Sequence, residues 1–309
     1  MNILTMQGTR RSFLGAIAGF SCTNRLSRAA PLELAPGVQL WSVREQLKQD
    51  FTGTLRRLHS IGYREVELFE LPPSPREFRK QVADAGLACI SGHFELMNLR
   101  NAAIIAAAQE LGLKYMILVF PELRAWKGQS VDEKFRQFVP RYEHISLADY
   151  QWNADQLNHC GATLNHHGIK AGFHNHAIDL KDLGNGQHGL DYLMQHTDPD
   201  LVCFEMDCGH VVHAGHDPVA YLNRYPKRIE LLHLKDLAPG YHVSTTLDTE
   251  EKDRNSEIGA GVIDWKKLFQ AASHAGNVKH CFVEHEGKMD HPPLEALQNS
   301  YNYLQTLKI

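Results

Sequence analysis

The sequence predicts a single (β/α)8 barrel, and three observations support this fold. Short apolar, β-branched runs alternate with helical patterns from residue 36 to the end, as the βα units of a parallel sheet require. The chain has 309 residues, 43% of them hydrophobic, so it can bury one large core. Several of the later runs end in a histidine or a carboxylate, as strands do at a barrel mouth that carries an active site.

Eight runs are expected to form the barrel strands, at residues 38–41, 65–69, 88–92, 115–120, 169–173, 202–206, 229–233 and 281–284. Helices are expected at 51–61, 75–85, 101–111 and 149–167, because each has a helical pattern and is followed by a glycine that suits a left-handed C-cap. Two longer connections, 121–147 and 237–262, each follow a strand. They lie on the face where barrel active sites form and are expected to cover the substrate.

Residues 1–30 are interpreted as a targeting segment that precedes the barrel at 36–309. Arg10 and Arg11 stand before a weakly apolar stretch, GAIAGF, and the small residues of SRAAP follow. This pattern resembles a twin-arginine export signal with its processing region. The alternative is an ordinary basic N-terminus. If the signal is used, the protein reaches the periplasm already folded, so a metal can be loaded in the cytoplasm before export.

Charge and composition favour small-molecule chemistry. A formal net charge of −4, without a block of lysine or arginine, provides no surface for nucleic acid or for an anionic membrane. No apolar run is long enough to span a membrane. The cysteines after the N-terminal segment lack CxxC spacing and are expected to be buried free thiols. A homo-oligomer is compatible with the sequence, since barrels of this kind often associate through helices and loops.

Metal-binding side chains stand at the ends of four predicted strands. They occur in GFHNH, FEMD, LLHLKD and FVEHE, and they are His174 with His176, Asp207, His233 and Glu284. The C-terminal ends of parallel strands meet at one end of a barrel, so these side chains are expected to form one divalent-metal centre. A set of imidazoles and carboxylates favours Mn²⁺, Zn²⁺, Co²⁺ or Fe²⁺ over Ca²⁺ or Mg²⁺, and open positions would accept two oxygens of a polyol or hydroxyketone.

Side chains two positions apart on a strand share a face, so three of these strands each offer two candidates. The pairs are His174 with His176, Glu205 with Asp207, and Glu284 with Glu286, and only one member of each pair needs to bind metal. Taken singly, each histidine is equally well explained as a hydrogen-bonded polar residue at a strand end. The recurrence of such residues at four successive strands favours a metal centre.

Seven motifs follow one another in order along the chain: VQLWSVR at 38–44, IGYREVE at 61–67, GFHNH at 172–176, DCGH at 207–210, HLKD at 233–236, IGAGVID at 258–264 and VE at 283–284. In these motifs the chain resembles the sugar phosphate isomerase/epimerase family, whose members have xylose isomerase-like TIM barrels. The histidine-rich fifth strand also resembles the inosose dehydratase and 3-keto-glycoside lyase branches.

The resemblance implies that His174, Asp207, His233 and Glu284 are the metal ligands. The family's usual set is Glu, Asp, His and Glu, and here His174 stands where the first glutamate would be. In the epimerases and isomerases, the two metal-bound glutamates exchange protons on opposite faces of the carbon next to the carbonyl. One of that pair is missing here, so the resemblance favours one-sided proton removal, as in a dehydratase or lyase. Asp179 stands where one subgroup has a longer glutamate.

Further site residues follow from the same resemblance and from their places at strand ends. His210 is interpreted as a substrate contact and as an acid or base, with orientation of Asp207 as the alternative. Lys235 shares a face with His233 and would bind a sugar oxygen or an enolate, with a salt bridge to Glu257 or Asp264 as the alternative. The catalytic candidates are His210, His176, Lys235 and Glu284, and the expected substrate contacts are Glu67, His93, His176, His210, Lys235 and Glu286.

These expectations describe an isomerase, epimerase or lyase that uses Mn, Co or Zn to remove a proton next to the carbonyl of a keto-sugar or keto-glycoside. The alternative is an exported sugar-binding protein with a vestigial metal site, which is disfavoured because clustered ligand groups are costly without a metal. Phosphodiester cleavage, as by the barrel relatives of endonuclease IV, is disfavoured because the chain lacks a basic nucleic-acid surface.

Overall fold

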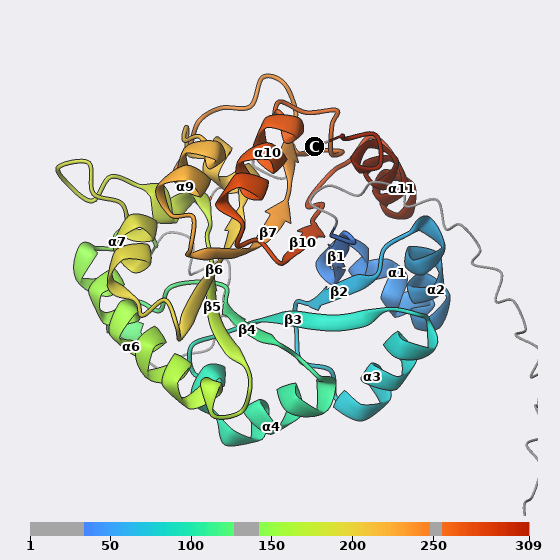
Figure 1. The fold of residues 1–309 in the computed structure, drawn as a ribbon, viewed down its shortest axis with the longest axis horizontal. Helices are drawn as coiled ribbons and strands as arrows, with labels where there is room; N and C mark the ends of the chain where they lie inside the picture. Colours follow the sequence, from blue (N-terminus) through green and yellow to red (C-terminus); the bar gives the residue numbers. More distant parts are fainter. Residues whose placement is uncertain (1–33, 127–141, 248–254, 309) are drawn as a thin grey trace, which may run out of the picture.

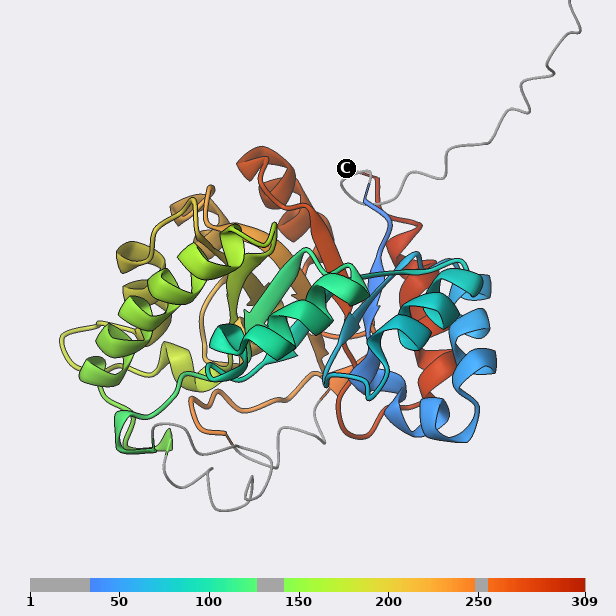
Figure 2. The same cartoon turned by 90° about the horizontal axis from the view of Figure 1, so that it is seen from below.

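A closed barrel of eight parallel strands forms the centre of the molecule (Figure 1). The computed structural model describes residues 34–126, 142–247 and 255–308. The strands close in the order β1, β10, β7, β6, β5, β4, β3, β2, so β1 pairs with both β2 and β10. Helices surround the strands in both views (Figures 1 and 2). The predicted (β/α)8 barrel is confirmed.

Each barrel strand lies within two residues of its predicted run. The strands are β1 (Gly37–Gln39), β2 (Glu65–Leu68), β3 (Ala88–Phe94), β4 (Tyr115–Leu118), β5 (Lys170–His174), β6 (Val202–Asp207), β7 (Ile229–Leu234) and β10 (His280–Val283). The first strand ends early because a 3-10 turn, η2 (Leu40–Val43), begins there. The Gln39 side chain caps that turn by accepting a hydrogen bond from the backbone N–H of Trp41.

The four predicted helices are confirmed as α2 (Phe51–Ile61), α3 (Pro75–Asp84), α4 (Ala102–Leu111) and α6 (Leu147–Asn165). Gly112 ends α4 in the left-handed region, with φ +82°, which a residue with a Cβ rarely adopts. The described residues also form α1 (Arg44–Gln49), α7 (Gly189–His196), α8 (Cys208–His213), α9 (Pro218–Arg224), α10 (Trp265–Ala275) and α11 (Pro293–Leu304).

Apolar side chains fill the barrel interior and the space between strands and helices. A small interior cluster comes from four strands and consists of Tyr115, Ile117, Cys203, Leu231 and Phe282. The interior is tightly packed at Gly172, where a Cβ would lie 2.3 Å from Cδ1 of Ile117. A larger cluster joins the strands to the surrounding helices. This packing supports the polar residues at the C-terminal ends of the strands.

The chain after β7 is held by a short antiparallel pair that the sequence analysis did not predict, β8 (Asp236–Leu237) with β9 (Asn255–Ser256). The Asp236 carboxylate accepts hydrogen bonds from Trp265 Nε1 at 2.7 Å and from the backbone N–H groups of Gly259 and Ile263 at 3.0 and 3.1 Å. Asp236 therefore fixes this chain directly beyond the last residues of β7.

Some expectations concern residues that the structure does not describe. The predicted twin-arginine segment at 1–30 is one of them, and parts of the two long connections, at 127–141 and 248–254, are others. Within the described ranges, no helix combines the length and the apolar character needed to cross a membrane. The cysteines are buried free thiols, as predicted, at Cys89, Cys160, Cys203, Cys208 and Cys281.

Candidate metal centre

The four expected metal ligands meet at the C-terminal end of the barrel. His174 and Asp207 are the last residues of β5 and β6. His233 lies near the end of β7, and Glu284 directly follows β10. One ligand atom from each residue lies within 4.8 Å of the other three. The side chains are enclosed by protein, since exposure of these residues ranges from 0% to 5%.

Strand register explains how these side chains come together. His174 pairs with Glu205 across β5 and β6, and Asp207 pairs with His233 across β6 and β7. His233 Nδ1 then lies 3.3 Å from Glu284 Oε2 and 3.9 Å from Asp207 Oδ2. One imidazole nitrogen and two carboxylate oxygens thus face one another, as the ligands of a single cation do.

The donor set fits a divalent metal. Asp207 Oδ1 accepts a hydrogen bond from the backbone N–H of His210 at 2.8 Å, which fixes the carboxylate at the start of α8. Its other oxygen, Oδ2, is buried and has no hydrogen-bond partner among the described residues, although Lys235 Nζ lies 3.2 Å away. A buried ionised oxygen is costly unless a cation pairs with it. Imidazole and carboxylate ligands together suit manganese, cobalt or zinc.

Lys235 is a buried cation beside this group. Its exposed fraction is 1%, and Nζ lies 2.8 Å from Glu286 Oε2 and 3.1 Å from Glu284 Oε2. Burial alone would raise the pKa values of Asp207 and Glu284, but Lys235 and the neighbouring histidines together outweigh burial and hold both pKa values below their usual range. The carboxylates are therefore ionised and able to bind a metal.

Glu67, Glu205 and His93 form what we call the inner cluster, which contacts the far nitrogens of two ligand imidazoles. Glu205 Oε2 lies 3.1 Å from His174 Nδ1 and 2.9 Å from His93 Nε2. Glu67 Oε2 lies 2.5 Å from His233 Nε2. Both glutamates are 0% exposed. Glu67 and His93 were expected to contact substrate, and the structure places them against the imidazoles of the candidate ligands.

Two further imidazoles border the candidate ligands. The His176 ring centroid lies 4.9 Å from that of His174 and 4.7 Å from that of His210. Phe120 stacks on His176, with the ring centroids 4.1 Å apart. Burial lowers the pKa of His176 well below its usual range, and the nearby His210 lowers it further. The His176 ring is therefore neutral at neutral pH.

Asp179 holds the segment that carries His176. One carboxylate oxygen accepts a hydrogen bond from the backbone N–H of His176 and the other from the Tyr150 hydroxyl, each at 2.7 Å. Burial raises the pKa of Asp179 to about 7, although these hydrogen bonds act in the opposite direction. Asp179 thus connects the turn after β5 to α6.

The position of His210 is compatible with contact to substrate as an acid or base and with orientation of Asp207. Its backbone N–H orients Asp207, as described above, and its ring Nε2 lies 3.1 Å from Lys235 Nζ. The same Nε2 is 4.0 Å from Asp207 Oδ2. The ring therefore contacts the buried lysine and lies near the Asp207 carboxylate.

Comparison with known families gives an assignment that covers most of the chain. Residues 55–307 match the family described as Xylose isomerase-like TIM barrel. The chain belongs to this family. The sequence-based resemblance is thereby confirmed.

Relatives within and around the xylose isomerase-like family include named enzymes. The inosose dehydratase of Lacticaseibacillus casei is 31% identical over 157 residues, which are 46% of this chain and 49% of that protein. The chain thus spans about half the length of this curated relative. The chain therefore belongs to an enzyme family and has a relative that is named as a dehydratase.

Solved structures show the same fold. A sugar phosphate isomerase/epimerase from Parabacteroides distasonis superposes with a TM-score of 0.67 and 24% identity, over 88% of this chain and 93% of that one. The 3-keto-D-glucoside 4-epimerase of E. coli superposes with a TM-score of 0.60 and 14% identity, over 84% of this chain and 95% of that one. At these identities, the likeness establishes the xylose isomerase-like fold alone.

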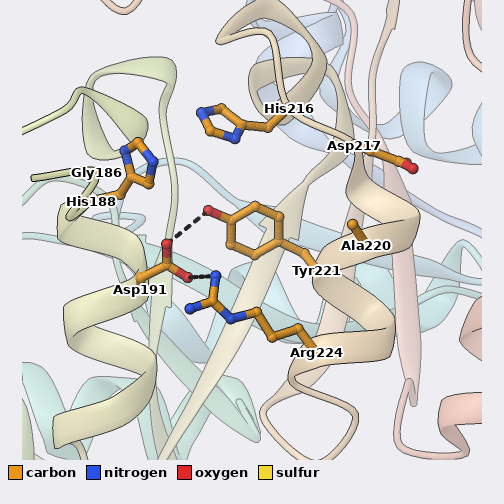
Figure 3. Close-up of a pocket in the computed structure, with 8 residues that line it drawn as sticks. All are labelled: Gly186, His188, Asp191, His216, Asp217, Ala220, Tyr221 and Arg224. Carbon is orange, nitrogen blue, oxygen red and sulfur yellow. Dashed lines mark hydrogen bonds and ion pairs between the residues drawn. The ribbon is translucent and has the colours of Figure 1, made fainter.

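A separate pocket of about 200 Å³ lies between α7 and α9 (Figure 3). Asp191 lines it, with the Tyr221 hydroxyl at 3.4 Å and Arg224 Nη1 at 3.2 Å. His188 and His216 border it on another side. Its lining contains none of the candidate metal ligands, so this pocket is distinct from the candidate metal centre.

Two residues of the barrel mouth were missed or underrated by the sequence analysis. Glu205 was considered only as an alternative to Asp207, because both lie on one face of β6. Gln39 was not considered, yet its Nε2 donates to Glu67 Oε2 at 2.9 Å. Alternation along a strand reveals which residues share a face, so it can identify Glu205. It does not reveal contacts between β1 and β2 such as that of Gln39.

Proposed function

We propose that this protein is a divalent-metal-dependent enzyme that removes a proton next to the carbonyl of a keto-sugar or keto-glycoside and then eliminates water or an aglycone. One observation carries the proposal: the candidate ligands converge on a single buried group with Lys235 beside it. Membership of an enzyme family with dehydratase and epimerase relatives supports it.

Charge balance supports a metal at this place. The barrel mouth buries the carboxylates of Glu67, Glu205, Asp207 and Glu284. Removing carboxylates from water is unfavourable unless cations or hydrogen bonds compensate. Lys235 supplies one positive charge, and a divalent ion held by the four candidate ligands would supply two more.

Each neighbouring residue has a role that its position supports. When bound, the metal would polarise the substrate carbonyl, which makes the neighbouring C–H acidic. Lys235 would stabilise the negative charge that develops on the carbonyl oxygen, because an ammonium group acts strongly in a site without water. Glu286 is a more exposed partner of Lys235 than Asp207 or Glu284, with 28% of its side chain accessible, and can accept a hydrogen bond from a substrate hydroxyl.

His176 is our candidate for the base. Its ring is neutral and is held by Phe120, and its Nδ1 has no hydrogen-bond partner among the described residues. This nitrogen can accept the proton from the substrate carbon. His210 would then donate a proton to the leaving oxygen. The C–H and C–O bonds break, a C=C bond conjugated with the carbonyl forms, and water or an alcohol departs.

Elimination is preferred to balanced exchange between epimers because of His174. The family resemblance places a glutamate at this position in epimerases, and a metal-bound imidazole is a poor base. The name of the L. casei relative, inosose dehydratase, agrees with elimination, although the match spans about half of that protein. The substrate class proposed is therefore a cyclic or glycosidic ketone with a leaving group on the second carbon from the carbonyl.

The decisive experiment combines metal analysis with a substrate screen. The purified full chain would be loaded with Mn²⁺, Co²⁺ or Zn²⁺ and incubated with 3-keto-glycosides, ketohexoses and inososes. Mass spectrometry would follow loss of water, release of aglycone and uptake of deuterium from the solvent. We expect metal-dependent elimination, absent from Asp207→Asn. Sugar binding without deuterium exchange or turnover would refute the enzyme and favour an exported sugar-binding protein.

A further inference from the structure

We infer that Glu67 and Glu205 are positioning residues that determine which nitrogen of His233 and of His174 faces the metal. This inference rests on the proposed metal centre, because it concerns the side chains that contact the candidate ligands His174 and His233. A neutral imidazole binds a metal through one nitrogen and carries a proton on the other, so the partner of the protonated nitrogen selects the tautomer.

His233 shows this arrangement most clearly, because its two nitrogens have different surroundings. Nδ1 faces Glu284 Oε2 at 3.3 Å and Asp207 Oδ2 at 3.9 Å, among the candidate ligands. Nε2 faces Glu67 Oε2 at 2.5 Å and Glu205 Oε2 at 3.2 Å. A proton on Nε2 would be donated to Glu67 and would leave the Nδ1 lone pair for the metal.

His174 shows the same arrangement with the nitrogens exchanged. Its Nδ1 lies 3.1 Å from Glu205 Oε2, so a proton there is donated to Glu205. The remaining nitrogen, Nε2, is then available as the ligand atom. The two imidazoles thus use opposite tautomers. Glu205 lies against the protonated nitrogen of both rings, and Glu67 lies against that of His233.

The inner cluster is itself held in place. Gln39 Nε2 donates to Glu67 Oε2 at 2.9 Å, and His93 Nε2 lies 2.9 Å from Glu205 Oε2 and 3.4 Å from Glu67 Oε2. His93 also stacks on His233, with centroids 5.3 Å apart and an interplanar angle of 23°. Both carboxylates are therefore oriented before a metal arrives.

The negative charge of these glutamates should also strengthen metal binding. A carboxylate that accepts the far N–H of an imidazole makes the ligand nitrogen more basic, and loss of such a partner typically weakens metal binding by about 10- to 100-fold. Glutamine in its place keeps the size and an acceptor oxygen but removes the charge. Glu67→Gln and Glu205→Gln therefore test the charge without opening a cavity.

Glu65 provides a matched control on the same strand. Its Oε2 lies 2.8 Å from His280 Nδ1, so it forms a glutamate–histidine contact between β2 and β10 that does not involve a candidate ligand. Glu65→Gln should bind metal like the wild type. Circular dichroism and the unfolding midpoint would verify that each variant is folded.

The test measures zinc affinity by competition with a chelating dye, together with the ¹⁵N chemical shifts of the histidine rings in the zinc-loaded wild type. We expect about 10- to 100-fold weaker binding in Glu67→Gln and in Glu205→Gln. The ring shifts should show a proton on Nε2 of His233 and on Nδ1 of His174. These shifts need no variant, so they decide the matter even if a variant does not fold.

Three results would overturn the inference while leaving the metal centre intact. The first is zinc binding by both variants as tight as that of Glu65→Gln, and the second is the opposite pair of tautomers. The third is two zinc ions per wild-type chain with one lost in Glu205→Gln, which would make the inner cluster a metal site of its own. Failure of the wild type to bind zinc, manganese or cobalt would instead overturn the proposed function itself, and the inference with it.

Discussion

Lys235 Nζ lies 3.2 Å from Asp207 Oδ2, with the lysine only 1% exposed. The same carboxylate oxygen faces His233 among the candidate metal ligands. A single aspartate therefore connects the position of the metal to the cation that would meet the substrate. Substitution of Asp207 and substitution of Lys235 should therefore have different effects on metal binding and turnover.

Loss of a ligand should abolish metal binding while the barrel stays folded. Asp207→Asn and His233→Gln keep the approximate size of each side chain but remove the charge or the imidazole. Because the apolar clusters lie elsewhere, we expect native circular dichroism, no stoichiometric metal and almost no turnover. His280→Gln, at the other end of the barrel, is the control. Full metal occupancy in both ligand variants would contradict the assignment.

Loss of the lysine should affect the reaction more than the metal. Lys235→Met removes the ammonium group that we place at the developing oxyanion, so kcat should fall by about 10²- to 10³-fold. Metal should stay bound, because the four ligand residues are unchanged. Steady-state kinetics and metal analysis of the same preparation measure the two effects. A variant with normal kcat would exclude Lys235 from the reaction.

Asp179 should make the folded protein less stable as pH rises. Its folded-state pKa is about 7, whereas an unfolded aspartate has a pKa of about 3.9. The folded state therefore holds the proton more tightly between these values. The free energy of unfolding should fall as pH rises from about 4 to about 7, by at most about 4 kcal/mol.

Asp179→Asn cannot lose a proton, so this contribution should be absent from the variant. Urea unfolding of both proteins at about pH 5 and about pH 8 measures the difference. Asp155→Asn, at an exposed position on α6, should behave like the wild type. Equal pH dependence in the wild type and Asp179→Asn would show that the buried carboxyl does not titrate in this range.

The stereochemistry of proton exchange should reveal a single base. In deuterium oxide, the wild type should place deuterium on only one face of the carbon next to the carbonyl, with elimination and little epimerised product. NMR of recovered substrate and product measures this. His174→Glu restores a carboxylate at that position and should raise epimerisation relative to elimination, if the variant keeps its metal. Rapid, balanced interconversion of two epimers by the wild type would rule out our preference for elimination.

The fold was readily predicted from the sequence, because periodicity and helix-ending glycines are local signals. The strands were found within two residues, and 51–61 was predicted with the bounds of α2. The same reasoning found the candidate ligands, since strand ends of a parallel barrel must converge. It did not find the β8–β9 pair, whose strands are two residues long and depend on distant partners of Asp236.

The side chains that contact the candidate ligands could not be predicted, for a different physical reason. Glu67 was assigned to substrate because it stands at a strand end, yet its carboxylate contacts His233 across the barrel. Alternation gives the direction of a side chain but not which opposite strand it reaches. That reach depends on the stagger of the strands around the closed barrel, which no single segment encodes.

The contact between Glu67 and His233 joins residues that are 166 positions apart in the chain. Gln39, which holds Glu67, lies on β1, the strand that pairs with β10 to close the barrel. A nascent chain in which β10 has not yet been synthesised therefore lacks the candidate ligand Glu284. It also lacks the strand that pairs with β1 to close the barrel. Contacts between such distant segments form slowly. During refolding, the metal should therefore bind only when β1 and β10 pair and the barrel closes. An optical signal from the bound metal would thus report the last step of folding rather than the first.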